Sequence, residues 1–285
     1  MRKLAPIVLF TYNRLWHTQE TIEALQKNEL ANESNLFIYS DGGKDEESWK
    51  KVNEVREYLK TINGFKKVIL TFQDNNIGLA DSIISGVTKI VNQYGKIIVL
   101  EDDIVTSQYF LKFMNEALDF YEKENKVWHI SGYLYPTCDG ISENNTFFLN
   151  IATCWGWATW KRSWKHLEYN PVKLVEMIKN EDISRFNLDN AYNWYSHLLA
   201  NRDKRMKTWA IRWYASFFAH NAFCLHPKYT LTKNIGNDNS GVHCGTNTIF
   251  TNQELENKNL KVEKIEFIEN NRVKMQLKKF FTKGK

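Results

Sequence analysis

The feature that most constrains the fold is an alternation of short apolar runs with amphipathic segments over the first 132 residues. The apolar runs, which we expect to be strands, are residues 4–10, 36–39, 67–72, 97–100 and 127–131. The segments with apolar residues at helical spacing, which we expect to be helices, are 17–27, 46–60, 79–91 and 110–122. This order predicts an α/β fold with a mostly parallel central sheet flanked by helices on both faces.

Polar residues follow each of the first four predicted strands. They are Thr11, Tyr12, Asn13 and Arg14 after the first strand, Asp41 after the second, Asn76 after the third, and Glu101, Asp102 and Asp103 after the fourth. The carboxyl ends of parallel strands meet at one edge of a sheet, where ligands bind in folds of this class. We therefore expect these side chains to share one rim.

The sequence KIIVLEDDI places three adjacent acids directly after a buried strand. Their repulsion and burial would raise their pKa values unless a cation lies beside them. Two structural alternatives exist: a helix cap, for which Thr106 and Ser107 are also available, and a solvated loop, which the apolar Ile104 and Val105 disfavour. We predict a site for Mn²⁺ or Mg²⁺, hard cations that bind carboxylate oxygens together with substrate phosphates.

A nucleotide-diphospho-sugar is the substrate class that fits such a rim, because a metal bridging the diphosphate offsets its charge. Asp41 would accept a hydrogen bond from the base or ribose, and Asn13, Arg14 and Asn76 would donate to base or phosphate. Each has a structural alternative, since the residues around Asp41 form an ordinary turn sequence and those around Asn76 an ordinary helix entry.

The second part of the chain, from residue 133, is rich in aromatic residues and suggests an aromatic-lined cleft in addition to core packing. We expect helices at 158–166, 187–200 and 211–220, and a turn-rich loop at 236–245. For Trp157, Trp160 and Trp164, which have helical spacing, packing in the core is favoured over stacking on a sugar. We divide the chain into a nucleotide-sugar-binding half (1–132), an acceptor-binding half of the same domain (133–250) and a basic amphipathic tail (251–285).

The tail ends in RVKMQLKKFFTKGK, which carries no acid. It could lie on an anionic membrane with Phe280 and Phe281 inserted, or be a frayed terminus. The net charge of +5 is mild, the four cysteines have no metal-site spacing, and no apolar run reaches the length of a membrane span. These features predict a cytoplasmic protein, at the inner face of the membrane if the tail binds lipid, and we expect no nucleic-acid partner.

Five segments, PIVLFTYNR, YSDGG, DNNIGLADSIISGV, VLEDDI and GWATWKRSW, together resemble GT-A glycosyltransferases. VLEDDI looks like the Asp-x-Asp metal motif in its Glu-Asp-Asp form, as in the N-acetylglucosaminyltransferase that starts complex N-glycan branching and in related bacterial sugar transferases. The resemblance covers most of residues 1–245. It implies that Asp103 ligates the metal, that Glu101 and Asp102 contact ribose or donor sugar, and that the loop at 236–245 closes over the donor. His243 would touch diphosphate or metal, or be an ordinary loop histidine.

The catalytic base is the point where the chain departs from that family. The family's Trp-Asp-Asp-Trp segment supplies its base, but the matching residues here, Trp209-Ala210-Ile211-Arg212, contain no acid. An inverting transfer needs a carboxylate near the acceptor hydroxyl. Asp238 is our first candidate and Asp203 the second, while Arg212 would bind phosphate or acceptor.

We therefore predict a metal-dependent, inverting hexosyl- or N-acetylhexosaminyltransferase that uses a UDP-sugar. Its acceptor would be a bacterial surface polysaccharide or a lipid-linked glycan, as the resemblance implies. A sugar-nucleotide pyrophosphorylase is an alternative, but the sequence FTYNRLWH lacks the Gly-rich loop that such an enzyme has after its first strand. A non-catalytic carbohydrate-binding protein would explain the tryptophans but not the three acids.

Overall fold

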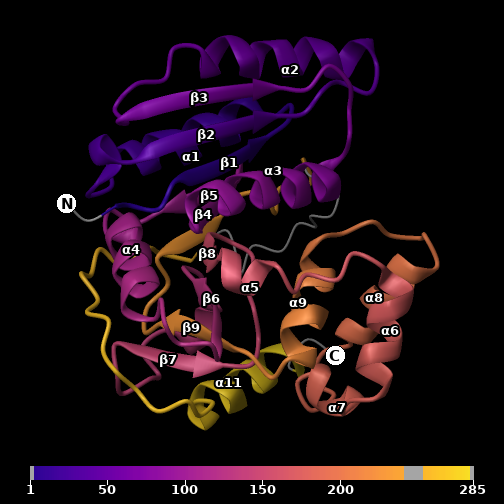
Figure 1. Cartoon of the computed structure of the whole chain (residues 1–285). Helices are drawn as coiled ribbons and strands as arrows, with labels where there is room; N and C mark the ends of the chain where they lie inside the picture. Colours follow the sequence, from indigo (N-terminus) through magenta and orange to yellow (C-terminus); the bar gives the residue numbers. More distant parts are fainter. Residues whose placement is uncertain (1–2, 241–252, 283–285) are drawn as a thin grey trace.

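The computed structural model describes residues 3–240 and 253–282. Its first part alternates strands and helices as the sequence predicts, with ends shifted by a few residues. In chain order the elements are β1 Ile7–Thr11, α1 Leu15–Gln26, η1 Ala31–Glu33, β2 Asn35–Ser40, α2 Glu46–Leu59, β3 Lys67–Phe72, α3 Leu79–Tyr94, β4 Lys96–Glu101, β5 Ile104–Thr106, α4 Phe110–Phe120 and β6 Val127–Ser131. Figure 1 shows these elements in the upper and central parts of the molecule.

One eight-stranded sheet runs through the described chain in the order β3-β2-β1-β4-β8-β6-β9-β7. Strands β1 to β4 are parallel, with Ile7 opposite both Leu36 and Ile98. β8 pairs antiparallel with β4, and β6 and β9 pair parallel with each other. The prediction of an α/β fold with a mostly parallel sheet is therefore confirmed.

The central strands of the sheet, such as β1, are buried along their length because both faces of the sheet are covered there. On β1, Val8 packs into the core on the α3 side, whereas Ile7 and Leu9 pack into the core on the opposite side, with residues of α1, α2 and α4. All three are fully buried. The side chains alternate between the faces as in any strand, but here neither face meets water.

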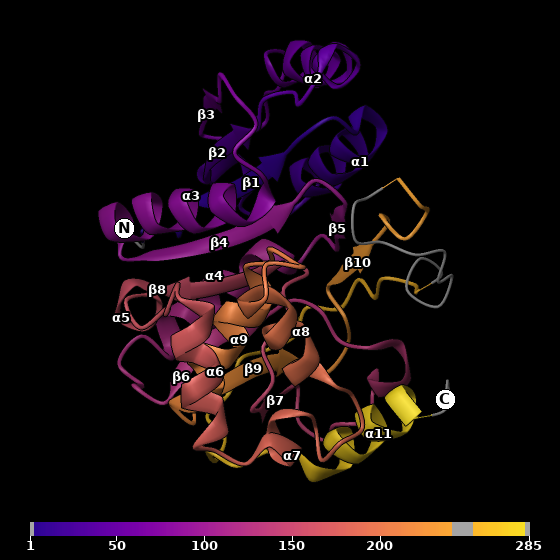
Figure 2. The ribbon, with the colours of Figure 1, turned by 90° about the vertical axis from the view of Figure 1, so that its right-hand side faces the viewer.

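The second part of the chain completes the sheet and adds a helical layer. Its elements are η2 Pro136–Cys138, β7 Thr146–Leu149, β8 Trp157–Trp160, α5 Lys161–Trp164, α6 Pro171–Lys179, α7 Ile183–Phe186, α8 Trp194–Arg202, α9 Ala210–Ala219, β9 Phe223–Pro227, β10 Thr232–Asn234 and α11 Asn271–Thr282. β10 pairs with β5 in a separate two-stranded sheet. Figure 2 shows α6, α8 and α9 grouped on one side of the strands.

The predicted helix at 158–166 is wrong in its first half. Residues Trp157–Trp160 form strand β8, which lies between β4 and β6 and is buried throughout, and α5 follows it. A central strand covered on both faces is buried at every position, so the spacing of its tryptophans does not distinguish a strand from a helix. The predicted helix at 187–200 begins only at Trp194, because Leu188, Asp189 and Asn190 adopt positive φ angles. The helix predicted at 211–220 is present as α9.

Trp157, Trp160 and Trp164 are buried in the core, as expected, and Trp157 and Trp164 belong to a cluster of tryptophans. The ring of Trp157 lies 5.2 Å from that of Trp209 and 5.7 Å from that of Trp164. The indole of Trp213 donates to Nδ1 of His129 at 3.0 Å, and Nε2 of His129 lies 2.8 Å from the carbonyl oxygen of Thr153. His129 is thus the neutral tautomer with its proton on Nε2, and burial lowers its pKa to about 3.

The basic tail forms helix α11, which packs on the domain through the buried Val273 and Leu277. The ring of Phe281 lies 5.2 Å from that of Tyr135 and 5.8 Å from that of Trp194. This part of the tail is neither frayed nor projecting, and the ring of Phe281 already has aromatic partners. Within residues 3–240 and 253–282, no helix is long and apolar enough to cross a bilayer.

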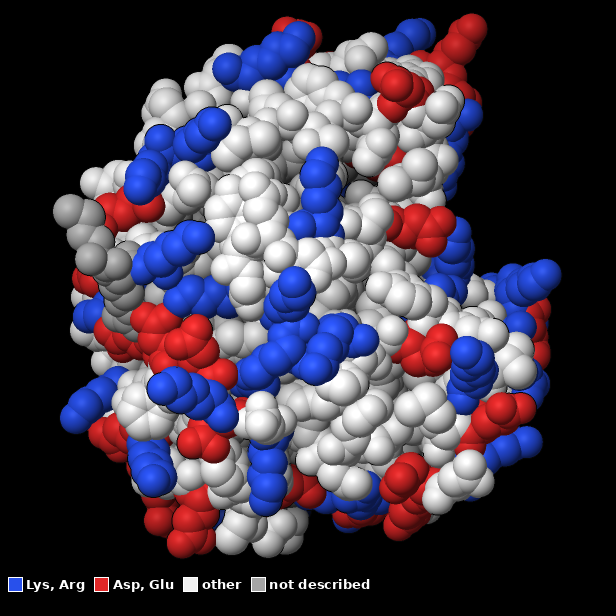
Figure 3. All heavy atoms as spheres, in the orientation of Figure 1, with Lys and Arg blue, Asp and Glu red and all other residues white. Residues whose placement is uncertain are grey.

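Acidic and basic side chains are mixed on the face shown in Figure 3, with one group of basic side chains over α5. Several basic residues of α11 are paired with acids as well: Lys274 contacts Glu269 at 2.8 Å, and Lys278 contacts Asp189 at 3.0 Å. The positive charge of the tail is therefore partly neutralised within the chain.

Candidate active site

The three acids lie at the carboxyl end of β4, where an arginine from the neighbouring strand end meets them. Arg14, from the loop after β1, contacts the carboxylate of Asp102 and donates from Nη2 to Oδ2 of Asp103 at 2.8 Å. The guanidinium offsets part of the negative charge of the acids, a role for which the sequence had indicated only a metal ion. We call Arg14, Glu101, Asp102 and Asp103 the acidic edge.

The acidic edge keeps an excess of carboxylates despite this arginine. Burial lowers the pKa of Arg14, but the charges of Asp102 and Asp103 outweigh that effect and raise it. Burial and the charges of the two aspartates raise the pKa of Glu101 to about 8. Burial also raises the pKa of Asp102, although Arg14 opposes it. The negative charge of the acids is therefore only partly balanced by Arg14, and the site favours binding of a further positive charge.

Three buried polar atoms at this edge have no hydrogen-bond partner in the described part of the chain. They are Oγ1 of Thr11, Nη1 of Arg14 and Oδ2 of Asp102. Leaving a buried donor or acceptor unpaired costs about 1–3 kcal/mol, and proteins usually avoid it. A donor and two oxygen acceptors held unpaired beside one another are typical of a place where a polar ligand binds.

The segment that follows β10 lies against the acidic edge. The amide of Ile235 donates to the carbonyl oxygen of Asp103 at 2.9 Å. A Cβ atom at Gly236 would lie 2.2 Å from Oδ2 of Asp103 and 2.9 Å from Nη1 of Arg14, so this position has no room for a side chain. The absence of a side chain at Gly236 lets the backbone approach both charged groups.

Asp238 lies close to the acidic edge and Asp203 does not contact it. Oδ2 of Asp238 is 3.0 Å from Nε2 of His17, a buried histidine whose charge also acts on Asp102. Burial raises the pKa of Asp238, but hydrogen bonds from Ser240 and the charge of His17 leave it lowered. Asp203 follows α8, where it pairs with its neighbours Arg202 and Arg205.

The rim residues on β2 and β3 are bonded to each other. The Asp41 carboxylate accepts four hydrogen bonds: from the amides of Gly42, Ile77 and Gly78, each at 2.9 Å, and from Nδ2 of Asn76 at 3.2 Å. These four bonds occupy the carboxylate oxygens of Asp41, which we expected to accept a hydrogen bond from a base or ribose. Asp41 thus fixes the entry to α3. Nδ2 of Asn76 also donates to the carbonyl oxygen of Gly42 at 2.8 Å, so the donors that we expected to meet a base or phosphate are used within the chain, and the side-chain oxygen of Asn76 is the group left for a ligand among the described residues.

Other predicted residues lie around this site with different partners. Tyr12 and Asn13 are half-buried directly after β1. Arg212 lies in α9 and donates to the side-chain oxygen of Asn201 at 3.3 Å. Trp209, which precedes α9, hydrogen-bonds to Glu101, so the start of α9 reaches the acidic edge. His243 lies outside the described residues.

Helix capping does not explain the three acids, and the predicted caps are wrong as well. α4 has no side-chain cap at its first position; instead Oδ1 of Asn28 accepts from the amide of Leu111 at 3.0 Å. Nδ2 of the same Asn28 donates to Thr106 at 2.8 Å. The cap comes from the end of α1, a contact between distant segments that the local sequence does not reveal.

The acidic edge fits a divalent cation that is held by one or two protein carboxylates and takes its other ligands from substrate and water. Among residues 3–240 and 253–282, no three His, Cys, Asp or Glu side chains are arranged to hold a metal by themselves. Asp102 and Asp103 nevertheless present hard oxygen atoms, one of them unpaired. Mg²⁺ and Mn²⁺ are commonly bound by one or two carboxylates, with the remaining positions filled by substrate phosphates and water.

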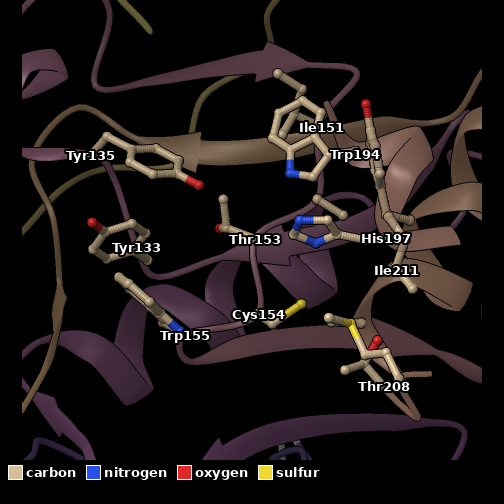
Figure 4. Close-up of a pocket in the computed structure, with 14 residues that line it drawn as sticks. Tyr133, Tyr135, Ile151, Thr153, Cys154, Trp155, Trp194, His197, Thr208 and Ile211 are labelled. Carbon is tan, nitrogen blue, oxygen red and sulfur yellow. The ribbon is translucent and has the colours of Figure 1, made fainter. Parts of the chain in front are cut away.

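A cavity of about 390 Å³ opens beside the acidic edge, between the sheet and the helices α8 and α9 (Figure 4). We call it the aromatic cavity; it is lined by Tyr133, Tyr135, Ile151, Ala152, Thr153, Cys154, Trp155, Trp194, His197, Met206, Thr208, Ala210, Ile211 and Tyr214. The thiol of Cys154 interacts electrostatically with Glu101, so the two sites are neighbours. The abundance of aromatic residues indicated a cleft, but not which of them line it.

No protein-family model and no curated protein matches the chain. Among solved structures, it is similar to the mannosyltransferase PcManGT from Pyrobaculum calidifontis in complex with GDP-Man and Mn²⁺, at 11% identity and a TM-score of 0.40, covering 63% of this chain and 47% of that one. It is also similar to mouse xyloside xylosyltransferase 1, at 8% identity and a TM-score of 0.39, covering 76% of this chain and 82% of that one. A third similar structure is that of residues 1–349 of S. aureus TarS, at 13% identity and a TM-score of 0.37, covering 64% of this chain and 50% of that one. The chain thus spans about half the length of the first and third of these.

Two of these three neighbours are named as sugar transferases, the class that the sequence motifs indicate. None is named as the N-acetylglucosaminyltransferase of N-glycan branching, and that closer resemblance stays a prediction. At these scores we draw neither a reaction nor a substrate from the neighbours, and the proposal below rests on the residues of the site.

Proposed function

We propose that the chain is a glycosyltransferase that moves a sugar from a nucleotide-diphospho-sugar to a glycan acceptor with the help of a divalent cation. The observation that carries this proposal is the acidic edge, where Asp102 and Arg14 keep buried polar atoms that have no partner in the described part of the chain, at the carboxyl ends of β4 and β1. A ligand that brings both a cation and phosphate oxygens would satisfy the carboxylate and the guanidinium together.

Asp103 and Asp102 are the residues that would hold Mn²⁺ or Mg²⁺. When bound, such an ion would offset the charge of the diphosphate that leaves with the nucleotide. Arg14 would donate to a phosphate from Nη1, the atom that has no partner among the described residues. Glu101 stays our proposed contact for ribose or donor sugar.

The nucleoside would lie along the ends of β1, β2 and β3. Asp41 supports this position indirectly, because its four hydrogen bonds hold Asn76 and the start of α3 in place. The side-chain oxygen of Asn76 and the side chains of Tyr12 and Asn13 are the groups that we propose to contact the base. Thr11 contributes a buried hydroxyl without a partner in the described chain.

For the base of an inverting transfer we propose Asp238 rather than Asp203. Asp238 is linked through His17 to the neighbourhood of Asp102, whereas Asp203 is exposed and pairs with two adjacent arginines. A base must lie within reach of the acceptor hydroxyl, and proximity to the acidic edge favours Asp238. Arg212 would then help to orient the acceptor from α9.

The finer identity of the substrates also belongs to this proposal. We favour a UDP-sugar carrying a hexosyl or N-acetylhexosaminyl group, and a bacterial surface polysaccharide or lipid-linked glycan as the acceptor, as the sequence resemblance implies. The alternative function, a sugar-nucleotide pyrophosphorylase, would instead use a nucleoside triphosphate and a sugar phosphate as its substrates. A carbohydrate-binding protein would have no use for the unpaired acidic edge.

The test is hydrolysis and transfer with a panel of UDP- and GDP-sugars in the presence of Mn²⁺. We expect turnover of at least one donor by the wild type, and a loss of about a thousandfold for Asp103→Asn. Asp189→Asn, which alters an exposed acid paired with Lys278, is the matched control and should be unaffected. No turnover with any donor, or full activity of Asp103→Asn, would overturn the proposal.

A further inference from the structure

The aromatic cavity has properties that the acidic edge lacks. None of the described residues that line it is an Asp, Glu, Lys or Arg. The one histidine, His197, has its pKa lowered by burial and is largely uncharged at neutral pH. A diphosphate or a uronic acid would find no cation there, so the cavity suits an uncharged ligand.

The walls of the cavity are suited to a ring with one apolar face. Five of the fourteen lining residues are Tyr or Trp. Figure 4 shows Tyr135, Trp194 and His197 arranged around the open space above Thr153. Polar groups of tyrosines, tryptophans and threonines alternate with the apolar ring faces, which matches the hydroxyl edges and C–H faces of a pyranose.

The cavity lies next to the place where a donor sugar would be held. Cys154 lines it and lies close enough to Glu101 for the two side chains to interact electrostatically. Trp209, which hydrogen-bonds Glu101, directly precedes Ala210, another lining residue. The cavity therefore borders residues that interact with Glu101 of the acidic edge.

We propose that the aromatic cavity binds an uncharged sugar ring of the acceptor, which deepens the proposed function and rests on it. Trp194 is the residue that determines this binding by stacking on the ring. The rings of Tyr192 and Phe281 lie 5.3 and 5.8 Å from Trp194 and hold it in place. A neutral hexose or N-acetylhexosamine is the ligand class; a uronic acid or sialic acid is excluded by the absence of a cation.

The test measures binding without any donor or metal, so that it does not depend on catalysis. Octyl β-glycosides of neutral hexoses and N-acetylhexosamines are titrated into the full chain by calorimetry, together with octyl glucuronide and octanol as probes for charge and for the alkyl chain. We expect at least one neutral glycoside to bind, with the glucuronide and octanol at least tenfold weaker. Equal binding of octanol would mean that the cavity takes an apolar chain, and equal binding of the glucuronide would contradict the charge argument.

Trp194→Ala should weaken binding of the neutral glycoside about tenfold or more, whereas Tyr169→Ala, which removes an exposed aromatic ring elsewhere, should leave it unchanged. If Trp194→Ala does not fold, Ala152→Phe, which fills the cavity without removing a wall, should have the same effect. Binding of UDP with Mn²⁺ should be retained in both. Wild-type protein that binds UDP but no neutral glycoside would overturn this inference alone, while failure to bind any nucleotide would overturn the proposed function.

Discussion

The acidic edge and the aromatic cavity lie side by side, yet they solve opposite physical problems. The edge gathers three acidic side chains and one guanidinium and leaves some of their atoms without a partner among residues 3–240 and 253–282. Within the same residues, the cavity has no Asp, Glu, Lys or Arg in its lining. In the function that we propose, the charged donor would bind at the edge and a neutral acceptor in the cavity, so that one sheet presents a separate surface to each.

The two regions also differ in how they are built. The edge consists of the strand ends of β1 and β4, parallel neighbours that bring Arg14 within 2.8 Å of Asp103 across 89 positions in the chain. The cavity is formed by the connections around β7 and β8 together with α8 and α9. The first follows from the geometry of a parallel sheet, whereas the second depends on how separate segments pack.

The largest effect should come from removing the carboxylate that we assign to the metal. Asp103→Asn keeps the size of the side chain but removes its charge, and we expect transfer to fall about a thousandfold. Binding of a neutral glycoside should stay as in the wild type, because Asp103 does not line the cavity. Kinetics and calorimetry on the same variant separate the two regions, and a parallel loss of glycoside binding would show that they are not independent.

Next in size is the effect of removing the internal cation of the edge. Arg14→Ala leaves the buried Asp102 and Asp103 without a counterion, and we expect a loss of about 3 kcal/mol in the free energy of unfolding without metal. Urea denaturation measures it, and added Mn²⁺ should restore more stability to this variant than to the wild type. Arg272→Ala, which breaks an exposed pair with Glu143, should cost under about 1 kcal/mol. A similar small cost for Arg14→Ala would mean that the acids carry little charge.

A third prediction concerns the core behind the cavity and its response to pH. His129 holds the carbonyl group of Thr153, a lining residue, and its pKa is lowered from 6.5 to about 3. The unfolded chain therefore binds the proton more readily, so the contribution of His129 to stability is complete above pH 6.5 and is lost as the pH falls. By pH 5 the loss should be about 2 kcal/mol.

His129→Gln retains a donor toward Thr153 and an acceptor toward Trp213 but cannot titrate. The difference in unfolding free energy between pH 7 and pH 5 should be about 2 kcal/mol smaller for this variant than for the wild type. Because other titrating groups are common to both proteins, their effects cancel in this comparison. Identical pH dependence of the two proteins would mean that His129 is not held neutral.

The smallest effect should come from the tail. Phe281→Ala removes a ring that contacts Tyr135 and Trp194, and we expect neutral glycosides to bind about threefold more weakly. UDP binding with Mn²⁺ should not change, because Phe281 contacts the cavity side only. Weakened nucleotide binding would instead indicate that α11 supports the whole domain and not the cavity wall in particular.

The sequence predicted the first half of the fold well because a parallel sheet covered on both faces leaves a clear pattern of apolar strands and amphipathic helices. It misplaced β8, whose residues Trp157–Trp160 are buried throughout and show no alternation of apolar and polar residues. It placed Arg14 and the three acids on one rim, but not in contact, because an ion pair between residues 14 and 103 leaves no local signal. Asp41 was expected to face a ligand, and only the structure reveals its four internal donors.

The aromatic cavity was the least predictable part. Its lining comes from several segments between residues 133 and 214. The sequence around the tryptophans in the core does not differ recognisably from that around the tryptophans that line the cavity. What distinguishes Trp194 from Trp157 is its partial exposure, which depends on packing against α11 and α9. Composition indicated an aromatic cleft, but its residues required the assembled fold.

The most direct test of the central claim is calorimetric titration of the wild type and Asp103→Asn with UDP and GDP, each with and without Mn²⁺. The acidic edge predicts that one of the nucleotides binds the wild type at least tenfold more tightly with Mn²⁺, and that Asp103→Asn abolishes this difference. Equal affinity with and without Mn²⁺, or an undiminished effect of Mn²⁺ in Asp103→Asn, would contradict it.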